Sequence, residues 1–109
     1  MHPFALKAKE LKDRGYPQSP IMFDNIYLVK SNQYAKFLGK DITEEFYLVP
    51  NPVSIMRMMI KYDYVIEHKY IGEEQDKESW AIKHKDQIFL SDALWVSLSN
   101  FWLFYEGKK

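Results

Sequence analysis

The chain of 109 residues contains no cysteine, and this absence excludes several kinds of chemistry. A protein without thiols has no disulfide, no thiolate zinc site and no cysteine nucleophile. The four glycines are isolated from one another, so no glycine-rich loop is available to bind a phosphate. No apolar run approaches the roughly 20 residues of a membrane span, and the first residues do not form a signal peptide. We therefore expect a soluble cytoplasmic protein without a cofactor and without membrane contact.

An excess of either charge is also missing. Fifteen Lys and Arg residues balance fifteen Asp and Glu residues, so the formal net charge is zero. Proteins that bind nucleic acids gain much of their affinity by neutralising phosphates, so this balance does not favour that role. Aromatic residues are abundant instead, at 17% of the chain. Because some of them alternate with lysines, as in Lys61-Tyr62 and His68-Lys69-Tyr70, a nucleic-acid-binding accessory protein stays as a third interpretation.

Hydrophobic periodicity along the chain predicts one α+β domain covering residues 1–109. In this domain three to four short helices pack with a small, mostly antiparallel sheet. Helices are expected over residues 3–14, 31–39, 53–61 and 92–105. Strands are expected over residues 26–29, 45–49 and 62–71, with a further strand that starts at Ser79. The pattern does not decide whether this last strand continues through residues 88–90 or turns at residues 85–87.

The segment 92–105 is the most aromatic part of the chain. At about 100° per residue, one stripe of a helix over this segment is typical of a face that packs on a core. The stripe contains Leu94, Trp95, Leu98, Phe101, Trp102 and Tyr105. Val96 and Leu103 fall on the opposite side, and Phe104 also lies off the stripe. A β-strand is the alternative, because Val96 and Leu98 alternate with serines.

The helices over 53–61 and 92–105 carry more apolar surface than one sheet face can cover. The first is apolar almost all round, so we expect it to be buried on most of its circumference. This surplus indicates a non-catalytic protein-interaction module, an accessory protein that forms a homodimer or docks on a larger protein. The residues expected at the interface are Val96, Leu103, Phe104, Met56 and Met59.

The tripeptide Glu67-His68-Lys69 supports a second interpretation. An acidic residue and a lysine two positions apart on a strand point the same way and could share a divalent metal and an attacking water. The tripeptide resembles the second half of the motif in restriction-endonuclease-like nucleases. That resemblance implies a metal-dependent nuclease that uses Glu67 and Lys69. Asp63, the further candidate, is expected on the same strand face four residues before Glu67, which departs from the pattern of the family. The family also needs an upstream aspartate, for which Asp41 or Asp24 would have to serve.

His68 and His84 are the candidates for a metal site. If the hairpin of the strands is centred near Gln75, these two imidazoles are diagonal neighbours on one face of the sheet. A metal site needs at least one further ligand. We therefore expect no bound metal and interpret both histidines as hydrogen-bonded side chains among aromatics.

Overall fold

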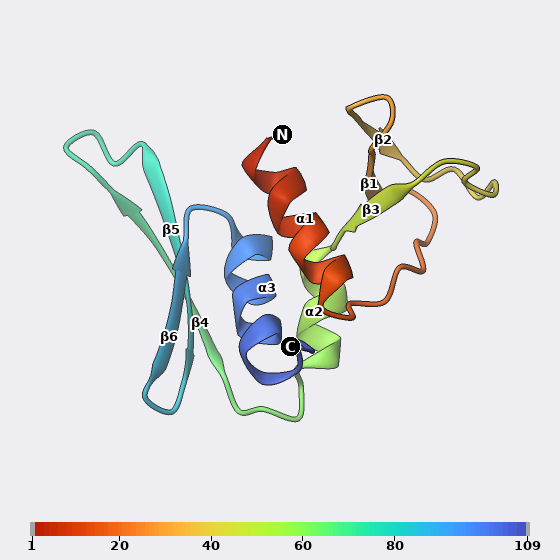
Figure 1. Ribbon diagram of the computed structural model, residues 1–109. Helices are drawn as coiled ribbons and strands as arrows, with labels where there is room; N and C mark the ends of the chain where they lie inside the picture. Colours follow the sequence, from red (N-terminus) through yellow and green to blue (C-terminus); the bar gives the residue numbers. More distant parts are fainter. Residues whose placement is uncertain (1, 109) are drawn as a thin grey trace. The chain divides into compact units, whose positions relative to one another are not determined.

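The computed structural model describes residues 2–108, which divide into two compact units. The first unit comprises the chain up to Asn51 together with the residues after Glu106, and the second spans Pro52–Glu106. Each unit contains its own three-stranded antiparallel sheet (Figure 1). The α+β class is confirmed, but there are two sheets instead of one, and the described residues form three helices. The expectation of a single domain stays a prediction.

The first unit consists of one helix and three strands in the spatial order β2-β1-β3. These elements are α1 (Pro3–Asp13), β1 (Asn25–Leu28), β2 (Gln33–Lys36) and β3 (Phe46–Val49). The helix begins after His2, whose Nδ1 accepts a hydrogen bond from the backbone N–H of Phe4 at 3.1 Å. It ends at Asp13, two residues before Gly15, whose φ of 95° favours glycine. Both ends of α1 agree with the sequence prediction.

The core of the first unit lies between α1 and the sheet. Ala5 and Ala8 are fully buried on α1 and cluster with Tyr27 of β1 and Tyr47 of β3. The two tyrosine rings are stacked, with centroids 6.0 Å apart. Small residues on the helix leave room for these large rings, so the side chains interlock closely.

The helix expected over residues 31–39 is wrong, because this segment contains strand β2. Asn32 adopts a left-handed φ of 54°, and its N–H donates to the carbonyl of Val29 at 3.3 Å. This turn brings Gln33 opposite Leu28, and the chain returns antiparallel along β1. The side chain of Asn32 also accepts a hydrogen bond from the hydroxyl of Tyr27. Pairing with β1 therefore overrides the local helix signals.

The second unit contains two helices and three strands, with the strands in the order β4-β5-β6. Its elements are α2 (Pro52–Met58), β4 (Val65–Ile71), β5 (Lys77–His84), β6 (Gln87–Ser91) and α3 (Leu94–Tyr105). Helix α3 packs on one face of the sheet, and α2 packs on α3 (Figure 1). The chain turns at Lys85-Asp86, where Lys85 has a φ of 53°. This turn settles the question that the sequence left open.

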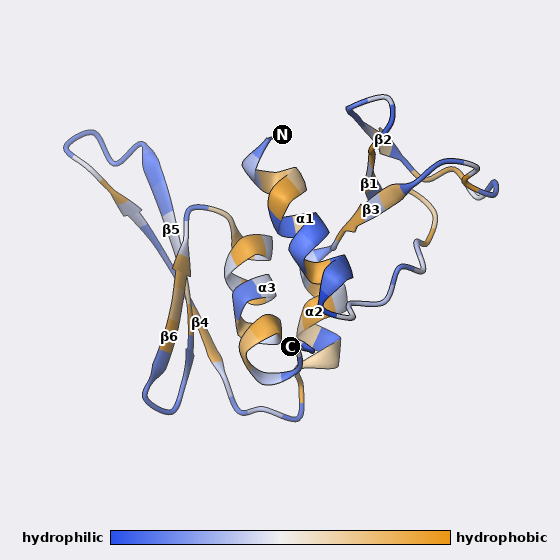
Figure 2. Ribbon diagram, in the orientation of Figure 1, coloured by the Kyte–Doolittle hydropathy of each residue, from blue (hydrophilic) through white to orange (hydrophobic). Residues whose placement is uncertain are grey.

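Helix α3 confirms the helical prediction for residues 92–105, and the strand alternative is wrong. Phe101 and Leu98 are fully buried, and the Phe101 ring lies 5.6 Å from that of Phe89 on β6. The hydroxyl of Ser97 donates to the carbonyl of Trp80 at 2.8 Å. This bond lets a polar residue face the sheet without losing its hydrogen-bond partner. Both α3 and β6 contain apolar segments, which are orange in Figure 2.

Helix α2 is less buried than expected. Ile55 of α2 and Met59, the residue after the helix, have no exposed surface. In contrast, Val53 is 50% exposed and Ile60 is 80% exposed. A helix of seven residues that packs on one neighbouring helix buries only one stripe. The expectation of burial around most of its circumference is therefore wrong.

The hairpin of β4 and β5 has a register that differs by two residues from the expected one. His68 lies opposite Trp80, and Ile66 lies opposite Ile82. Because the difference is even, each side chain keeps its predicted face. Tyr70, on the same face as His68, is 57% exposed. Its partner on β5 is Glu78, and β6 pairs with β5 only from Trp80 onwards, so the tip of the hairpin has no third strand.

Candidate interaction surface on the second sheet

The face of the β4-β5-β6 sheet that points away from α3 carries a shallow groove of about 250 Å³. Small residues on the central strand, Ser79 and Ala81, form its floor. Ile88 and Leu90 of β6 line one side and are 56% and 63% exposed. A small residue opposite larger ones leaves a depression because the flanking side chains rise above it. The groove therefore follows directly from the residue sizes on three adjacent strands.

The opposite side of the groove is charged. Glu67 and Lys69 of β4 line it together with Lys83 of β5. The Lys83 Nζ lies 2.8 Å from the Glu67 Oε2, and this hydrogen-bonded ion pair lowers the pKa of the Glu67 carboxyl below its ordinary value of 4.5. Glu67 is therefore ionised at neutral pH and engaged with a lysine. The groove joins an apolar wall to a charged one.

The nuclease interpretation receives only part of the geometry that it needs. Glu67 and Lys69 do share one face of β4, as the two-residue spacing predicts. Asp63 lies before the strand begins, and its backbone carbonyl accepts a hydrogen bond from Nδ1 of His84 at 2.7 Å. Among residues 2–108, no group of three His, Asp or Glu residues could hold a metal ion. The structure thus does not bring Asp63, Glu67 and a further acidic side chain together.

The two histidines share the helix-facing side of the sheet but are not neighbours. His68 pairs with Trp80, and His84 lies four residues further along β5. At ~3.3 Å per residue, this spacing separates the two backbones by ~13 Å, so the diagonal contact expected from the sequence is wrong. The His68 ring stacks on Trp80 with centroids 3.9 Å apart, and its Nε2 lies 3.2 Å from Glu78 Oε1.

The residues predicted for an interface have unequal access to solvent. Leu103 is 3% exposed and Met59 is fully buried, so neither is available on the surface. Val96 and Met56 are half-buried. The exposed seam expected from Val96 and Leu103 on α3 is therefore wrong. Phe104 is 58% exposed, and its ring centroid lies 5.5 Å from that of Phe89 on β6.

Sequence reasoning missed Ile88 and Leu90 as surface residues. The signal was present in the triplet Ile88-Phe89-Leu90, in which alternate side chains of a strand face opposite sides. Phe89 packs on α3, so its two neighbours must point away from the helix. The sequence alone did not show which face α3 covers.

Comparisons of this chain with protein-family models, curated proteins and solved structures found no match. Within residues 2–108 no helix has the length and apolar character needed to cross a membrane.

Proposed function

We propose that this protein is a non-catalytic interaction module that binds a partner protein through the outer face of the β4-β5-β6 sheet. The observation that carries the proposal is the exposure of Ile88 and Leu90, which are adjacent on that face and line a groove. Apolar side chains gathered at a depression are typical of binding surfaces.

The energetics of this surface support binding. Full burial of an exposed isoleucine or leucine contributes about 1.5–3 kcal/mol, and covering Ile88 and Leu90, which are 56% and 63% exposed, would contribute a fraction of that value for each. Val65, 59% exposed, lies on the same face of β4, with Lys83 of β5 between it and Ile88. The Glu67–Lys83 pair gives this surface a polar side, as the rim of an interface has. Such a surface both attracts a partner and restricts its orientation.

Site-specific photocrosslinking tests this proposal. A photoreactive amino acid replaces Leu90 in one variant and Leu38 in a control, because these leucines are 63% and 64% exposed in different units. We expect a crosslinked species with one defined protein component from position 90 and none of it from position 38. Equal crosslinking at both positions, or none at position 90, would contradict the proposal.

A metal-dependent nuclease is the second candidate, favoured by the placement of Glu67 and Lys69 at one groove. A ligand that binds only the native state raises the melting temperature. If this interpretation holds, Mn²⁺ raises the melting temperature of the native protein but not that of Glu67→Gln. An identical response of the two proteins to Mn²⁺ would count against it.

A further inference from the structure

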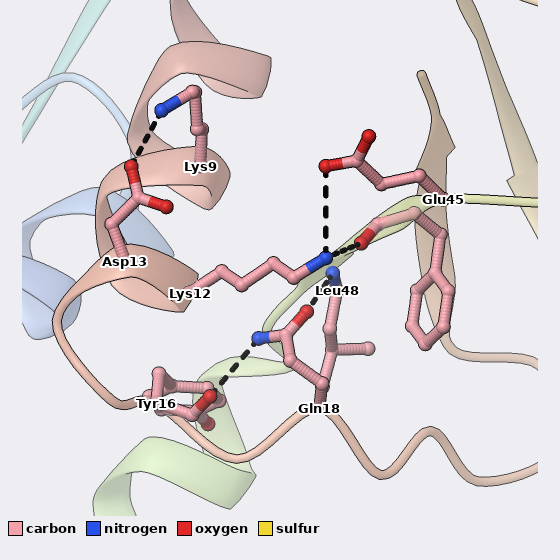
Figure 3. A network of polar contacts seen from close by, with 8 residues as sticks. Lys9, Lys12, Asp13, Tyr16, Gln18, Glu45 and Leu48 are labelled. Atoms are coloured by element: carbon pink, nitrogen blue, oxygen red, sulfur yellow. Dashed lines mark hydrogen bonds and ion pairs between the residues drawn. The ribbon is translucent and has the colours of Figure 1, made fainter. Parts of the chain in front are cut away.

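Each three-stranded sheet has two edge strands. The four edges differ in whether side chains bind or shield the backbone groups that have no partner strand. The outer edge of β3 is occupied by side chains of its own unit (Figure 3). Lys12 donates to the carbonyl of Phe46 at 3.1 Å, and the side-chain oxygen of Gln18 accepts the N–H of Leu48 at 2.9 Å. These two bonds occupy two of the four backbone groups that another strand would use, so they obstruct strand addition at β3.

Two further edges carry charged residues. Strand β4 holds Glu67, His68 and Lys69 at its centre, and β2 is a four-residue strand that ends in Lys36. Short edges and charged side chains are the usual means by which sheets avoid pairing with other chains. Both edges are therefore poorly suited to accept a further strand.

Strand β6 is also short, with five residues, but its edge carries no charged side chain. Its sequence, Gln87–Ser91, contains no charge and no proline and has three large apolar residues in a row. His84 and Gln87 flank the two-residue turn, so they exchange backbone hydrogen bonds. Along an antiparallel pair, hydrogen-bonded and non-hydrogen-bonded residue pairs alternate, so Phe89 bonds to β5 whereas Ile88 and Leu90 do not. The backbone groups of Ile88 and Leu90 consequently point away from β5, toward the free edge. Among the contacts of residues 2–108, no side chain bonds to them as Lys12 and Gln18 bond to β3.

Apolar side chains flank this edge on both faces of the sheet. Ile88 and Leu90 are exposed on the outer face, and Phe104 of α3 is 58% exposed beside Phe89 on the helix face. A strand added at the edge of β6 would send alternate side chains to both faces and cover all of these groups. Phe104, which the sequence predicts at an interface, would thus be covered by a strand that pairs with β6.

We propose that a second copy of this chain binds at the free edge of β6 in antiparallel orientation. A two-fold axis at Phe89 places Ile88 of each copy opposite Leu90 of the other. Both edge-facing residues of each strand then exchange N–H and C=O bonds, which uses all the free groups of the strand. The β4-β5-β6 sheet of one copy and that of the other then form a single sheet of six strands.

The pattern of β6 favours a second copy over an unrelated peptide. Two-fold pairing requires a self-complementary surface, in which residue i meets residue j and j meets i. Here an isoleucine meets a leucine on the outer face, while Phe89 meets its own counterpart near Phe104 on the helix face. A strand added at this edge needs apolar side chains on both faces of the sheet, and β6 of a second copy has them.

Sedimentation velocity over a concentration series tests the dimer. We expect the mass of the unmodified protein to rise from 13.1 kDa to twice that value. Leu90→Lys places a charge beside the edge and should weaken dimerisation by about tenfold or more, whereas Leu38→Lys should leave it unchanged. Ile88→Lys provides a second variant if Leu90→Lys does not fold. A protein that stays at 13.1 kDa throughout, or equal loss in Leu38→Lys, overturns the proposal.

The register is tested by cysteine crosslinking, since the chain has no cysteine of its own. In the proposed dimer, residues 88 and 90 of different copies form a hydrogen-bonded pair with Cα atoms ~5.5 Å apart, within reach of a disulfide. A mixture of Ile88→Cys and Leu90→Cys should therefore oxidise to a mixed dimer. Each variant alone should crosslink much less, because like positions lie beyond disulfide range. Equal crosslinking in the separate variants overturns this pairing.

This inference rests on the proposed function, but the two can fail separately. A crosslink from position 90 to a different protein, with a chain that sediments as a monomer, would leave the interaction module standing and overturn self-pairing. Absence of any crosslink at position 90 together with a monomeric chain would remove both.

Discussion

The side-chain oxygen of Gln18 lies 2.9 Å from the backbone nitrogen of Leu48, thirty residues further along the chain. The same amide donates to the carbonyl of Tyr16 at 3.1 Å, so it joins the loop after α1 to the edge of β3 (Figure 3). Leu48 is 6% exposed, and a buried N–H without a partner is costly.

Replacing Gln18 should therefore destabilise the protein. We expect Gln18→Ala to lower the free energy of unfolding by about 1–2 kcal/mol, because the N–H of Leu48 loses its acceptor. Urea denaturation measures this difference. Gln33→Ala, at an exposed position of β2, serves as the control and should change stability little. A loss of equal size in both variants would contradict the role assigned to Gln18.

Leu103 provides a test of core packing. The side chain is 3% exposed, so Leu103→Ala should lower the free energy of unfolding by about 2–5 kcal/mol through lost burial and a cavity. Leu38→Ala, at a leucine that is 64% exposed, should cost far less. Thermal and urea unfolding measure both. A Leu103→Ala protein as stable as the control would restore the exposed seam that the sequence suggested.

The ion pair of Glu67 and Lys83 predicts a specific titration. Lys83 lowers the pKa of the Glu67 carboxyl, so Lys83→Gln should raise that pKa toward its ordinary value of 4.5. Carbon-detected NMR of the carboxyl resonance measures the change, with Lys85→Gln in the exposed turn as the control. Because the folded-state pKa is depressed, the pair stabilises the fold above pH 4.5, and this contribution is lost as the pH falls through the folded-state pKa.

Tyr16 should titrate apart from the exposed tyrosines. Burial, with a smaller contribution from the charge of Asp24, raises the pKa of Tyr16 from 10.0 to about 12. Ultraviolet titration should show a phenolate component near pH 12 that disappears in Tyr16→Phe. Since the folded-state pKa is raised, the corresponding stability is full below pH 10 and is lost as the pH rises toward 12. Titration of every tyrosine near pH 10 would contradict this burial.

The prediction of a single domain concerns how the two units unfold. All three tryptophans, Trp80, Trp95 and Trp102, lie in the second unit, so their fluorescence reports that unit alone. The amide resonances of Ala8 and Tyr27 report the first unit. If the chain is one cooperative domain, both probes give the same urea midpoint. Separate midpoints would show that the units unfold independently.

Several elements could be predicted because their signals are local. Pro3 and Gly15 mark the ends of α1, Pro52 marks the start of α2, and the aromatic periodicity of 94–105 specifies a helix. The alternation along β4 likewise places Glu67 and Lys69 on one face. These features depend on backbone restrictions and on side-chain spacing within one element, which a sequence contains directly.

Other features were decided by contacts between distant residues. Pairing with β1 turned the segment around Tyr34 into a strand, and the five-residue loop of the β4-β5 hairpin shifted the expected register by two. The periodicity of α3 placed Leu103 opposite the main stripe but did not reveal that it is buried.

The sequence by itself determined which side chains share a face, because that depends only on the 3.6-residue and two-residue periods of helix and strand. Only the tertiary structure decided which faces are covered. Phe89 turns toward α3 and leaves Ile88 and Leu90 in solvent, while Gln18 obstructs the edge of β3 and no comparable residue within 2–108 obstructs that of β6. Burial is a property of what packs against a face, and the residues that do so lie elsewhere in the chain.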